Sequence, residues 1–337
     1  MSWKVKISKS GKVFEVEDEE SVLTAALRQD VGLPYGCRNG NCGSCRAVLL
    51  EGEVDYGKHL PAAMTGEDVP EHSVILCQAH PKSDLLIDAD ELEVVAGLHP
   101  RILPCRVVSL NRLTDEVMAV GLRLPQSQSL KYMAGQYIDI LLPGGKRRSY
   151  SLAHAPATSD VLELHIGYVE GGLFTSRVFN EMKEKELLRL NGPLGSFFIR
   201  AEIEAPIILV AGGTGYAPIQ AMLEQLFIDK DSREVFFYMG ARNKRDLYMH
   251  QQCLDWQQQH QHFHYTPVLS EPSSEDQWTG ATGWVQDQIL GDFSELAGCQ
   301  LYIAGPPVMI RAMKKSLGDA GLKPYRMFYD SFEFAEA

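Results

Sequence analysis

Four cysteines have the spacing of an iron–sulfur site. Cys37, Cys42 and Cys45 lie within residues 36–45, Gly-Cys-Arg-Asn-Gly-Asn-Cys-Gly-Ser-Cys, and Cys77 follows about thirty residues later. This is the plant-type spacing for a [2Fe–2S] cluster, in which four thiolates hold two irons. Structural zinc is the alternative, but zinc sites usually combine two Cys-x-x-Cys pairs, and only Cys42 and Cys45 form one here. The pattern therefore predicts a [2Fe–2S] cluster.

The glycines of this loop suit the same chemistry. Gly36, Gly40 and Gly43 permit positive φ and close backbone approach. Amide N–H groups of such a loop can point at sulfur, where they offset the negative charge of the cluster and tune its potential.

Length and composition limit the other possibilities. A chain of 337 residues should hold two or three domains, at roughly 100–200 residues each. The longest aliphatic run is residues 207–211, and the start, Met-Ser-Trp-Lys-Val-Lys-Ile, lacks the apolar core of a signal peptide. We therefore expect no membrane span. Three further scattered cysteines indicate a reducing, cytoplasmic setting rather than a disulfide framework.

The negative charge is concentrated near the cysteines. Residues 1–98 carry 9 Lys and Arg against 17 Asp and Glu, and the rest carries 23 against 27. Nucleic acid is a poor partner for such a surface. A protein partner with a basic patch fits the charge, and simple solubility is the equally good alternative.

The order of predicted elements divides the chain into three parts. Residues 3–7 and 12–17 read as a hairpin, Ser21 as a helix cap, and 47–50 and 74–77 as strands, which indicates a small α+β roll. Residues 91–104, with two prolines, form a boundary. Short strands with one helix at 176–183 then indicate a small barrel. From Pro206 strands and helices alternate, as in a doubly wound parallel sheet, with helices expected at 218–227, 246–258, 284–290 and 307–320.

A second set of motifs lies in the predicted barrel. Arg148-Ser149-Tyr150-Ser151 follows Gly135-Gln136-Tyr137 and precedes Gly172-Leu173-Phe174-Thr175. Arginine grips phosphate, an aromatic face suits a planar ring, and a hydroxyl can donate or accept a hydrogen bond. This order resembles the FAD domain of the ferredoxin–NADP reductase superfamily. The resemblance implies that Arg148 grips the flavin diphosphate, Tyr150 lies on the flavin ring and Ser151 faces its reactive nitrogen. His165, Gly172 and Thr175 are assigned as further FAD contacts.

Two glycine turns follow strands of the third part. Residues 211–218, Ala-Gly-Gly-Thr-Gly-Tyr-Ala-Pro, follow a buried strand and open a helix, the context in which a dinucleotide phosphate binds. Proline replaces the third glycine of Gly-x-Gly-x-x-Gly, which the first helical turn accepts. The variant matches the same superfamily, and this implies nucleotide contacts from Gly212, Gly213, Thr214, Gly215 and Pro218.

The second turn, residues 304–309, resembles the Cys-Gly-Pro-Pro-x-Met of that superfamily. Ala304 stands in place of the cysteine, which leaves Gly305 and Pro306 to shape the nicotinamide site. An aromatic near the C-terminus often covers the flavin in this superfamily, and we expect Phe332 there; ordinary packing of a terminal strand is the equally good alternative.

The choice between NADH and NADPH depends on two residues. Arg242 follows the second strand of the third part and could attract a 2′-phosphate. Glu271 follows the third strand, where NADPH-specific members of the superfamily have an arginine. A carboxylate repels a phosphate and accepts a hydrogen bond from a ribose hydroxyl, so we expect NADH to be preferred to NADPH.

The resemblance covers nearly all of the chain and implies a multidomain fold of α+β, β-barrel and α/β parts. These are a ferredoxin-like β-grasp roll at 1–93, a six-stranded antiparallel FAD-binding barrel at 100–203 and a doubly wound parallel-sheet NAD(P)H-binding domain at 204–337. It implies a reductase that passes electrons from NADH through FAD and the cluster to an acceptor protein.

The identity of that acceptor is left open by the motifs. Residues 134–139 and 278–283 are most similar to reductases that serve a sugar dehydrase of deoxyhexose biosynthesis. Reductase components of mono- and dioxygenases share the same architecture, so an oxygenase component is the alternative acceptor. A redox sensor or carrier without turnover is a third possibility.

Overall fold

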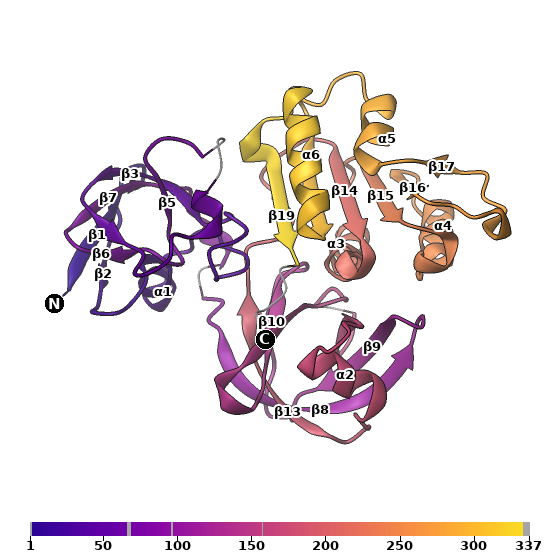
Figure 1. Ribbon diagram of the computed structural model, residues 1–337, viewed down its shortest axis with the longest axis horizontal. Helices are drawn as coiled ribbons and strands as arrows, with labels where there is room; N and C mark the ends of the chain where they lie inside the picture. The colour runs from indigo at the N-terminus through magenta and orange to yellow at the C-terminus, as the bar shows by residue number, and fades with distance from the viewer. Residues whose placement is uncertain (1, 66–68, 96, 157, 333–337) are drawn as a thin grey trace. The chain divides into compact units, whose positions relative to one another are not determined.

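The computed structural model (Figure 1) describes residues 2–65, 69–95, 97–156 and 158–332. The chain forms two compact units. One consists of Met1–Pro100 with Leu194–Ser196, and the other of Arg101–Pro193 with Phe197–Ala337. No helix in the described ranges is long and apolar enough to span a bilayer.

The first unit is a five-stranded sheet that shares its core with one helix, in the order β2-β1-β7-β3-β5. β1 and β2 form the predicted antiparallel hairpin, and β1 runs parallel to β7. Helix α1 begins after Ser21, whose Oγ accepts a hydrogen bond from the N–H of Thr24 at 3.2 Å, which confirms the predicted cap. The elements are β1 (Trp3–Ile7), β2 (Val13–Val16), α1 (Val22–Arg28), β3 (Arg46–Glu51), β4 (Val54–Asp55), β5 (Ser73–Ile75), β6 (His80–Pro81) and β7 (Leu85–Asp88).

Cys77 lies beyond the strand that was predicted to carry it. β5 ends at Ile75, where the carbonyl oxygen accepts hydrogen bonds from the N–H groups of Gln78 and Ala79 at 3.1 and 3.0 Å. These bonds form a tight turn, so the strand prediction for 74–77 was wrong in its last two residues. Cys77 therefore faces the cysteine loop from a turn.

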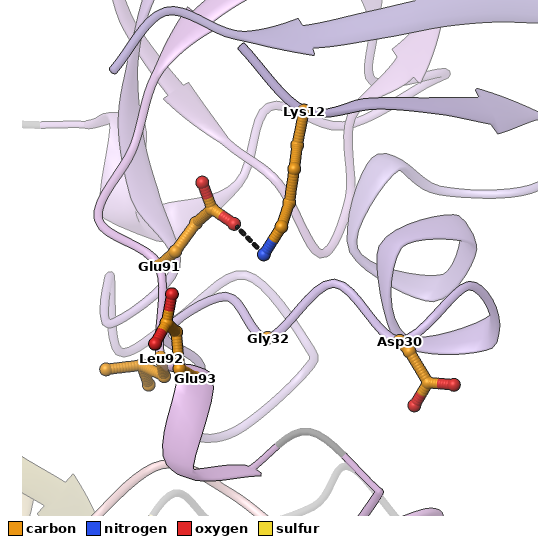
Figure 2. Close-up of a pocket in the computed structure, with 6 residues that line it drawn as sticks. All are labelled: Lys12, Asp30, Gly32, Glu91, Leu92 and Glu93. Atoms are coloured by element: carbon orange, nitrogen blue, oxygen red, sulfur yellow. Dashed lines mark ion pairs between the residues drawn. The ribbon is translucent and has the colours of Figure 1, made fainter. Parts of the chain in front are cut away.

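The end of the first unit folds against the loop that follows α1. The N–H of Leu92 donates to the carbonyl oxygen of Gly32 at 2.9 Å, and the Nζ of Lys12 lies 2.7 Å from the carboxylate of Glu91. Figure 2 shows these residues around a pocket of about 290 Å³. The start of the predicted boundary is thus packed onto this unit as far as the 3-10 turn η2 (Glu93–Val95).

The first part of the second unit is a six-stranded sheet in the order β11-β10-β13-β8-β9-β12. The pairs β10–β11, β8–β13, β8–β9 and β9–β12 are antiparallel. The ends of the sheet meet through a bridge between Leu152 and Leu164, which closes the barrel. The elements are β8 (Arg101–Arg112), β9 (Val117–Arg123), β10 (Tyr137–Leu141), β11 (Arg147–Ser151), β12 (Val161–Gly167), α2 (Leu173–Asn180) and β13 (Leu187–Leu194).

Two elements of the barrel differ from the sequence prediction. β8 starts at Arg101 and runs through Pro104, because Pro104 pairs only with β13 and the pairing with β9 begins at Arg106. A proline is tolerated where one side of a strand has no partner. Helix α2 begins at Leu173 instead of 176, because Gly172 caps it and accepts the N–H of Ser176 at 3.0 Å.

The remainder of the second unit is a six-stranded parallel sheet in the order β17-β16-β15-β14-β18-β19. Its strands are β14 (Ile207–Gly212), β15 (Val235–Ala241), β16 (Phe263–Leu269), β17 (Ala281–Thr282), β18 (Gln300–Gly305) and β19 (Met327–Ser331). Its helices are α3 (Tyr216–Ile228), α4 (His250–Gln259), α5 (Val285–Asp292) and α6 (Pro307–Asp319). α4 starts four residues later than predicted because a separate 3-10 turn, η5 (Lys244–Asp246), precedes it.

Helices cover both faces of this sheet, as the doubly wound prediction requires. Along β14, Ile207 and Leu209 belong to the core that includes α3 and α4, whereas Ile208 and Val210 belong to the core that includes α5 and α6. Side chains of a strand alternate between faces, so both faces of β14 are buried.

The strand order reverses beside β14. The chain passes from β14 to β15 on one side and later to β18 on the other. In open α/β sheets, ligands bind at the carboxyl ends of the strands at this point. Both strands end in the predicted glycine turns, and the two turns are in close contact: a Cβ on Gly215 would lie 2.0 Å from the carbonyl oxygen of Ala304.

This contact generates a stability prediction. Gly215→Ala should lower the free energy of unfolding by about 1–3 kcal/mol, because the added methyl forces the two turns apart. Gly291→Ala is the control, since its Cβ would meet no atom within 4 Å. The midpoint of thermal unfolding measures the difference, and equal midpoints for the two variants would contradict the prediction.

Candidate functional site

The four cysteines of the predicted cluster form two pairs. The Sγ of Cys37 accepts the N–H of Cys42 at 3.4 Å, and the Sγ of Cys42 accepts the N–H of Cys37 at the same distance. The thiols of Cys37 and Cys42 act on each other's ionisation, as do those of Cys45 and Cys77. The thiol of Cys42, joined by backbone N–H groups, lowers the pKa of Cys37 to about 6, and the thiol of Cys45 lowers that of Cys77. Each pair thus favours one thiolate, the form that binds iron, whereas the paired thiol and burial raise the pKa of the partner cysteines Cys42 and Cys45.

The loop backbone explains how amides reach these sulfurs. Gly40 and Gly43 have φ of +82° and +78°, as predicted. Gly36 does not have a positive φ; it is required for space, because its Cβ would lie 3.3 Å from the Sγ of Cys42. Arg38 has φ of +61°, a conformation that L residues rarely adopt, and no sequence signal indicated it.

The pairs fit two irons better than one zinc. A tetrahedral zinc site needs four ligands around one point, whereas two irons take a pair each. Cys45 and Cys77 are buried, and Cys37 and Cys42 are half-buried, so one pair lies nearer to solvent.

The cluster ligands can be tested by a matched pair of substitutions. Cys42→Ser should impair the [2Fe–2S] spectrum and lower cytochrome c reduction, while FAD content and NADH–ferricyanide activity largely survive. Cys299→Ser removes a buried cysteine of the α/β domain and should keep the cluster. Loss of FAD together with both activities in Cys42→Ser would contradict the prediction.

The predicted flavin residues lie on β11 beside β10. Tyr150 pairs with Ile138 and Ser151 with Tyr137. The Tyr150 ring is half-buried and lies 5.7 Å from the ring of Phe174 between centroids. The Oγ of Ser151 donates to the Oδ2 of Asp330 at 3.0 Å, and both side chains are buried. Asp330 lies on β19, and the sequence analysis missed it because a single acid near a chain end carries no pattern.

Two helix N-termini suit the phosphates of FAD and the nicotinamide nucleotide. α2 starts after Gly172 and α3 after Gly215, and neither helix has a side-chain cap or an acid in its first turn. N–H groups at the start of a helix attract anions; α3 continues from the 3-10 turn η4 (Gly213–Gly215), in which the N–H of Tyr216 is already bonded to the carbonyl oxygens of Gly213 and Thr214. The hydroxyl of Thr175 is already used, since it donates to the carbonyl oxygen of Val169 at 3.1 Å. Arg148 is half-buried, and its Nη1 donates to the carbonyl oxygen of Arg147 at 2.8 Å.

The end of β19 joins the flavin strand to the second glycine turn. Asp330 binds Ser151, and two residues later the N–H of Phe332 donates to the carbonyl oxygen of Gly305 at 3.0 Å. Gly305 has φ of +146°, and its Cβ would lie 2.9 Å from the carbonyl oxygen of Gly212. Pro306 caps α6. The structure therefore brings together Ser151, Phe332 and the turns at Gly212 and Gly305.

The remaining nucleotide residues have different surroundings. Thr214 lies against Gly167 of β12, and Gly213 has φ of +56° with open space around it. Pro218 is the third residue of α3. The N–H of Glu271 donates to the carbonyl oxygen of Arg242 at 2.8 Å, so the two residues that bear on cofactor choice are neighbours.

His165 has no ring nitrogen available to bind FAD. Its Nδ1 lies 3.1 Å from the hydroxyl of Tyr248 and its Nε2 lies 3.1 Å from the carboxylate of Glu163. Both ring nitrogens are therefore occupied, and the ring stacks on that of Tyr216 in α3. Its assignment to the FAD site rests on its place in β12 alone.

Three protein families match successive parts of this chain. Residues 5–82 match the 2Fe-2S iron-sulfur cluster binding domain, residues 104–199 the oxidoreductase FAD-binding domain, and residues 209–315 the oxidoreductase NAD-binding domain.

Similar proteins share this arrangement over their full length. The CDP-6-deoxy-L-threo-D-glycero-4-hexulose-3-dehydrase reductase of Yersinia pestis is 37% identical over 98% of this chain and 99% of its own. The phenol 2-monooxygenase reductase component DmpP of Pseudomonas sp. strain CF600 is 35% identical over 98% and 95%. The crystal structure of the Amycolatopsis cytochrome P450 reductase GcoB has a TM-score of 0.80 at 30% identity, with 98% of each chain covered.

Proposed function

The chain belongs to the family of reductases that join a [2Fe–2S] domain to FAD- and NAD-binding oxidoreductase domains, and we propose that it passes electrons from NADH through FAD and the cluster to a partner enzyme. When bound, FAD supplies the step that the residues cannot, because it takes an electron pair from a nicotinamide and releases single electrons to the cluster.

The contact between Ser151 and Asp330 is the observation that carries this proposal. It joins the flavin strand β11 to β19. Directly after β19, the N–H of Phe332 bonds the carbonyl oxygen of Gly305 in the proposed nicotinamide turn. A donor ring at the ends of β14 and β18 would thus lie next to a flavin held on β11. The Ser151 hydroxyl proton points at Asp330, which leaves the serine oxygen free as an acceptor. Positioning of this kind is the contribution of the protein.

Other residues bind and orient the flavin. The guanidinium of Arg148 and the N–H groups at the start of α2 would hold the diphosphate, and the half-buried Tyr150 ring offers a flat apolar face. Phe332 would lie over the flavin from the Gly305 turn, at which its backbone is fixed.

The partner is proposed to be a sugar dehydrase, because the Yersinia relative is named as a dehydrase reductase over nearly the same length. An oxygenase component is the second candidate, supported by the phenol 2-monooxygenase relative.

Steady NADH oxidation with ferricyanide would exclude a sensor without turnover. The seven cysteines form no disulfide, which supports a reducing cytoplasmic setting.

The partner assignment is tested by reconstitution. The reductase is mixed with NADH, the purified Yersinia 3-dehydrase and its CDP-hexulose substrate, and product is followed by chromatography. We expect product that requires both proteins, NADH and the CDP-hexulose substrate. Turnover with phenol hydroxylase oxygenase but none with the dehydrase would favour the second candidate.

NADH is proposed as the donor because of the charges near the ribose site. The exposed guanidinium of Arg242 lies 3.9 Å from the carboxylates of Glu116 and Asp246, which offset its attraction for a phosphate. The exposed Glu271 carboxylate repels a 2′-phosphate by about 1 kcal/mol per charge pair at 4 Å in water and about 4 kcal/mol at an effective dielectric of 20.

The corresponding substitution is Glu271→Arg. It should shift the ratio of kcat/KM toward NADPH by about tenfold or more, if about 1.4 kcal/mol is exchanged. Glu275→Arg makes the same charge change in the neighbouring turn η6 (Ser274–Asp276) and should shift the ratio less. Wild-type kcat/KM for NADPH equal to that for NADH would overturn the assignment.

A further inference from the structure

The outer face of β12 contacts the α/β part of the second unit. Leu162, Leu164 and Ile166 belong to the barrel core, so the alternate residues Glu163, His165 and Gly167 face away from it. The neighbours of these three residues include residues that do not belong to the barrel sheet. Gly167, for example, lies against Thr214 of the first glycine turn. The face that points outward thus carries two titratable side chains at a largely buried position.

His154 lies between two carboxylates from the two parts of this unit. Its Nδ1 is 2.9 Å from the Oε1 of Glu224 in α3, and its Nε2 is 3.3 Å from the Oε1 of Glu163 in β12. The side chains of Glu224 and Glu163 are 13% and 23% exposed, and that of His154 is 27% exposed. Two partly desolvated carboxylates need a cation between them, and an imidazolium can donate to both at once.

The carboxylates raise the pKa of His154 to about 10, with Glu163 the first cause and Glu224 the second. In turn His154, followed by His165, lowers the pKa of Glu163 to about 2. His154 is therefore protonated and Glu163 ionised across the neutral range. A protonated histidine donates from both ring nitrogens and carries its charge in a short side chain, so it fits between the two carboxylates.

The same network reaches a second segment of the α/β part. Glu163 also bonds His165, and His165 bonds the hydroxyl of Tyr248, which lies between β15 and α4. One nitrogen of His165 can donate to Glu163 while the other accepts from Tyr248.

The remaining groups around His154 hold Glu224 and His154 itself, and the Nε2 of Gln220 lies 3.3 Å from the Nδ1 of His154. The N–H of Ala155 donates to its Oε2 at 2.9 Å, and the Nε2 of Gln220 lies 3.3 Å from its Oε1. The hydroxyl of Tyr132 donates to the carbonyl oxygen of His154 at 2.9 Å. Glu163 and Glu224 are the two carboxylates that face the imidazole, and Tyr132 and His165 are the other titratable groups nearby.

We infer that His154 is a positioning residue for the nicotinamide nucleotide, because it ties Glu163 of the barrel to Glu224 of the helix that opens with the Gly212–Gly215 turn. This inference rests on the proposed function. Glu224 lies nine residues beyond Gly215, roughly 13 Å along a straight helix. A helix is rigid over this length. The contacts of His154 with Glu163 and Glu224 therefore set how the Gly212–Gly215 turn lies relative to the flavin strand β11.

The pH dependence follows from the sign of the shift. The His154 pKa is raised above its ordinary value of 6.5, so the stabilisation is full below pH 6.5 and is lost as pH rises through about 10. Nucleotide affinity should follow the folded-state value. The KM for NADH of the wild type should therefore rise as pH passes about 9 to 10.

The test uses the full-length, FAD-loaded protein with NADH and ferricyanide. His154→Gln leaves Glu163 and Glu224 facing each other without a cation. It should raise the KM for NADH roughly tenfold and change kcat less. This is below the loss of rate, up to about a hundredfold, that a misplacement of reacting groups by about 1 Å can cause. The double variant His154→Gln/Glu224→Gln removes one negative charge and should recover most of the affinity. His262→Gln breaks a similar His–Glu pair inside the α/β part, 2.8 Å from Glu234, and is the control.

The pH profile separates positioning from mere stability. His154→Gln should lose the alkaline rise in KM, keep its FAD and remain folded at the assay temperature. An unchanged KM with intact FAD, no recovery in the double variant, or the same effect in His262→Gln would overturn the inference while leaving the proposed function intact. Absence of NADH oxidation by the wild type would instead overturn the proposed function.

Discussion

The hydrogen bond between Ser151 and Asp330 is the contact on which the proposed catalytic arrangement depends. It joins a barrel strand to the last strand of the parallel sheet at a buried position, where a lost hydrogen bond costs more than at the surface. Because Phe332, directly after β19, also bonds the Gly305 turn, one short strand joins the residues that we propose for the flavin and for the nicotinamide. The network around His154 supplies another attachment, in which Glu224 of α3 and Glu163 of the barrel meet the same imidazole.

The parts that could be predicted from the sequence are those with local causes. Cysteine spacing predicted the cluster, because four thiolates for two irons need a tight loop. Glycine turns after buried strands predicted the nucleotide-binding fold, and Gly215 shows why, since any side chain there meets Ala304. Ser21 was recognisable as a cap because its side chain acts on the residues that immediately follow. Each of these signals can be read from the types and spacing of residues in a short stretch of sequence.

The parts that escaped prediction depend on contacts between distant residues. Asp330 bonds a serine 179 positions away, and Glu224 bonds a histidine 70 positions away. No periodicity records such pairs. The strand through Pro104 was missed because a proline is tolerated there only where β9 does not pair with β8. Cys77 was misplaced because it lies in a turn that follows the strand. The pairing of thiols into Cys37 with Cys42 and Cys45 with Cys77 likewise needed three dimensions.

The central claim is that electrons from a nicotinamide reach the cluster through the flavin. It is tested most directly by mixing the anaerobic, cofactor-loaded protein with NADH and recording flavin absorbance together with the electron paramagnetic resonance of the reduced [2Fe–2S] cluster. The account predicts that flavin bleaching is followed by the signal of the reduced cluster within a single mixing experiment. A bleached flavin beside a cluster that stays oxidised would contradict it.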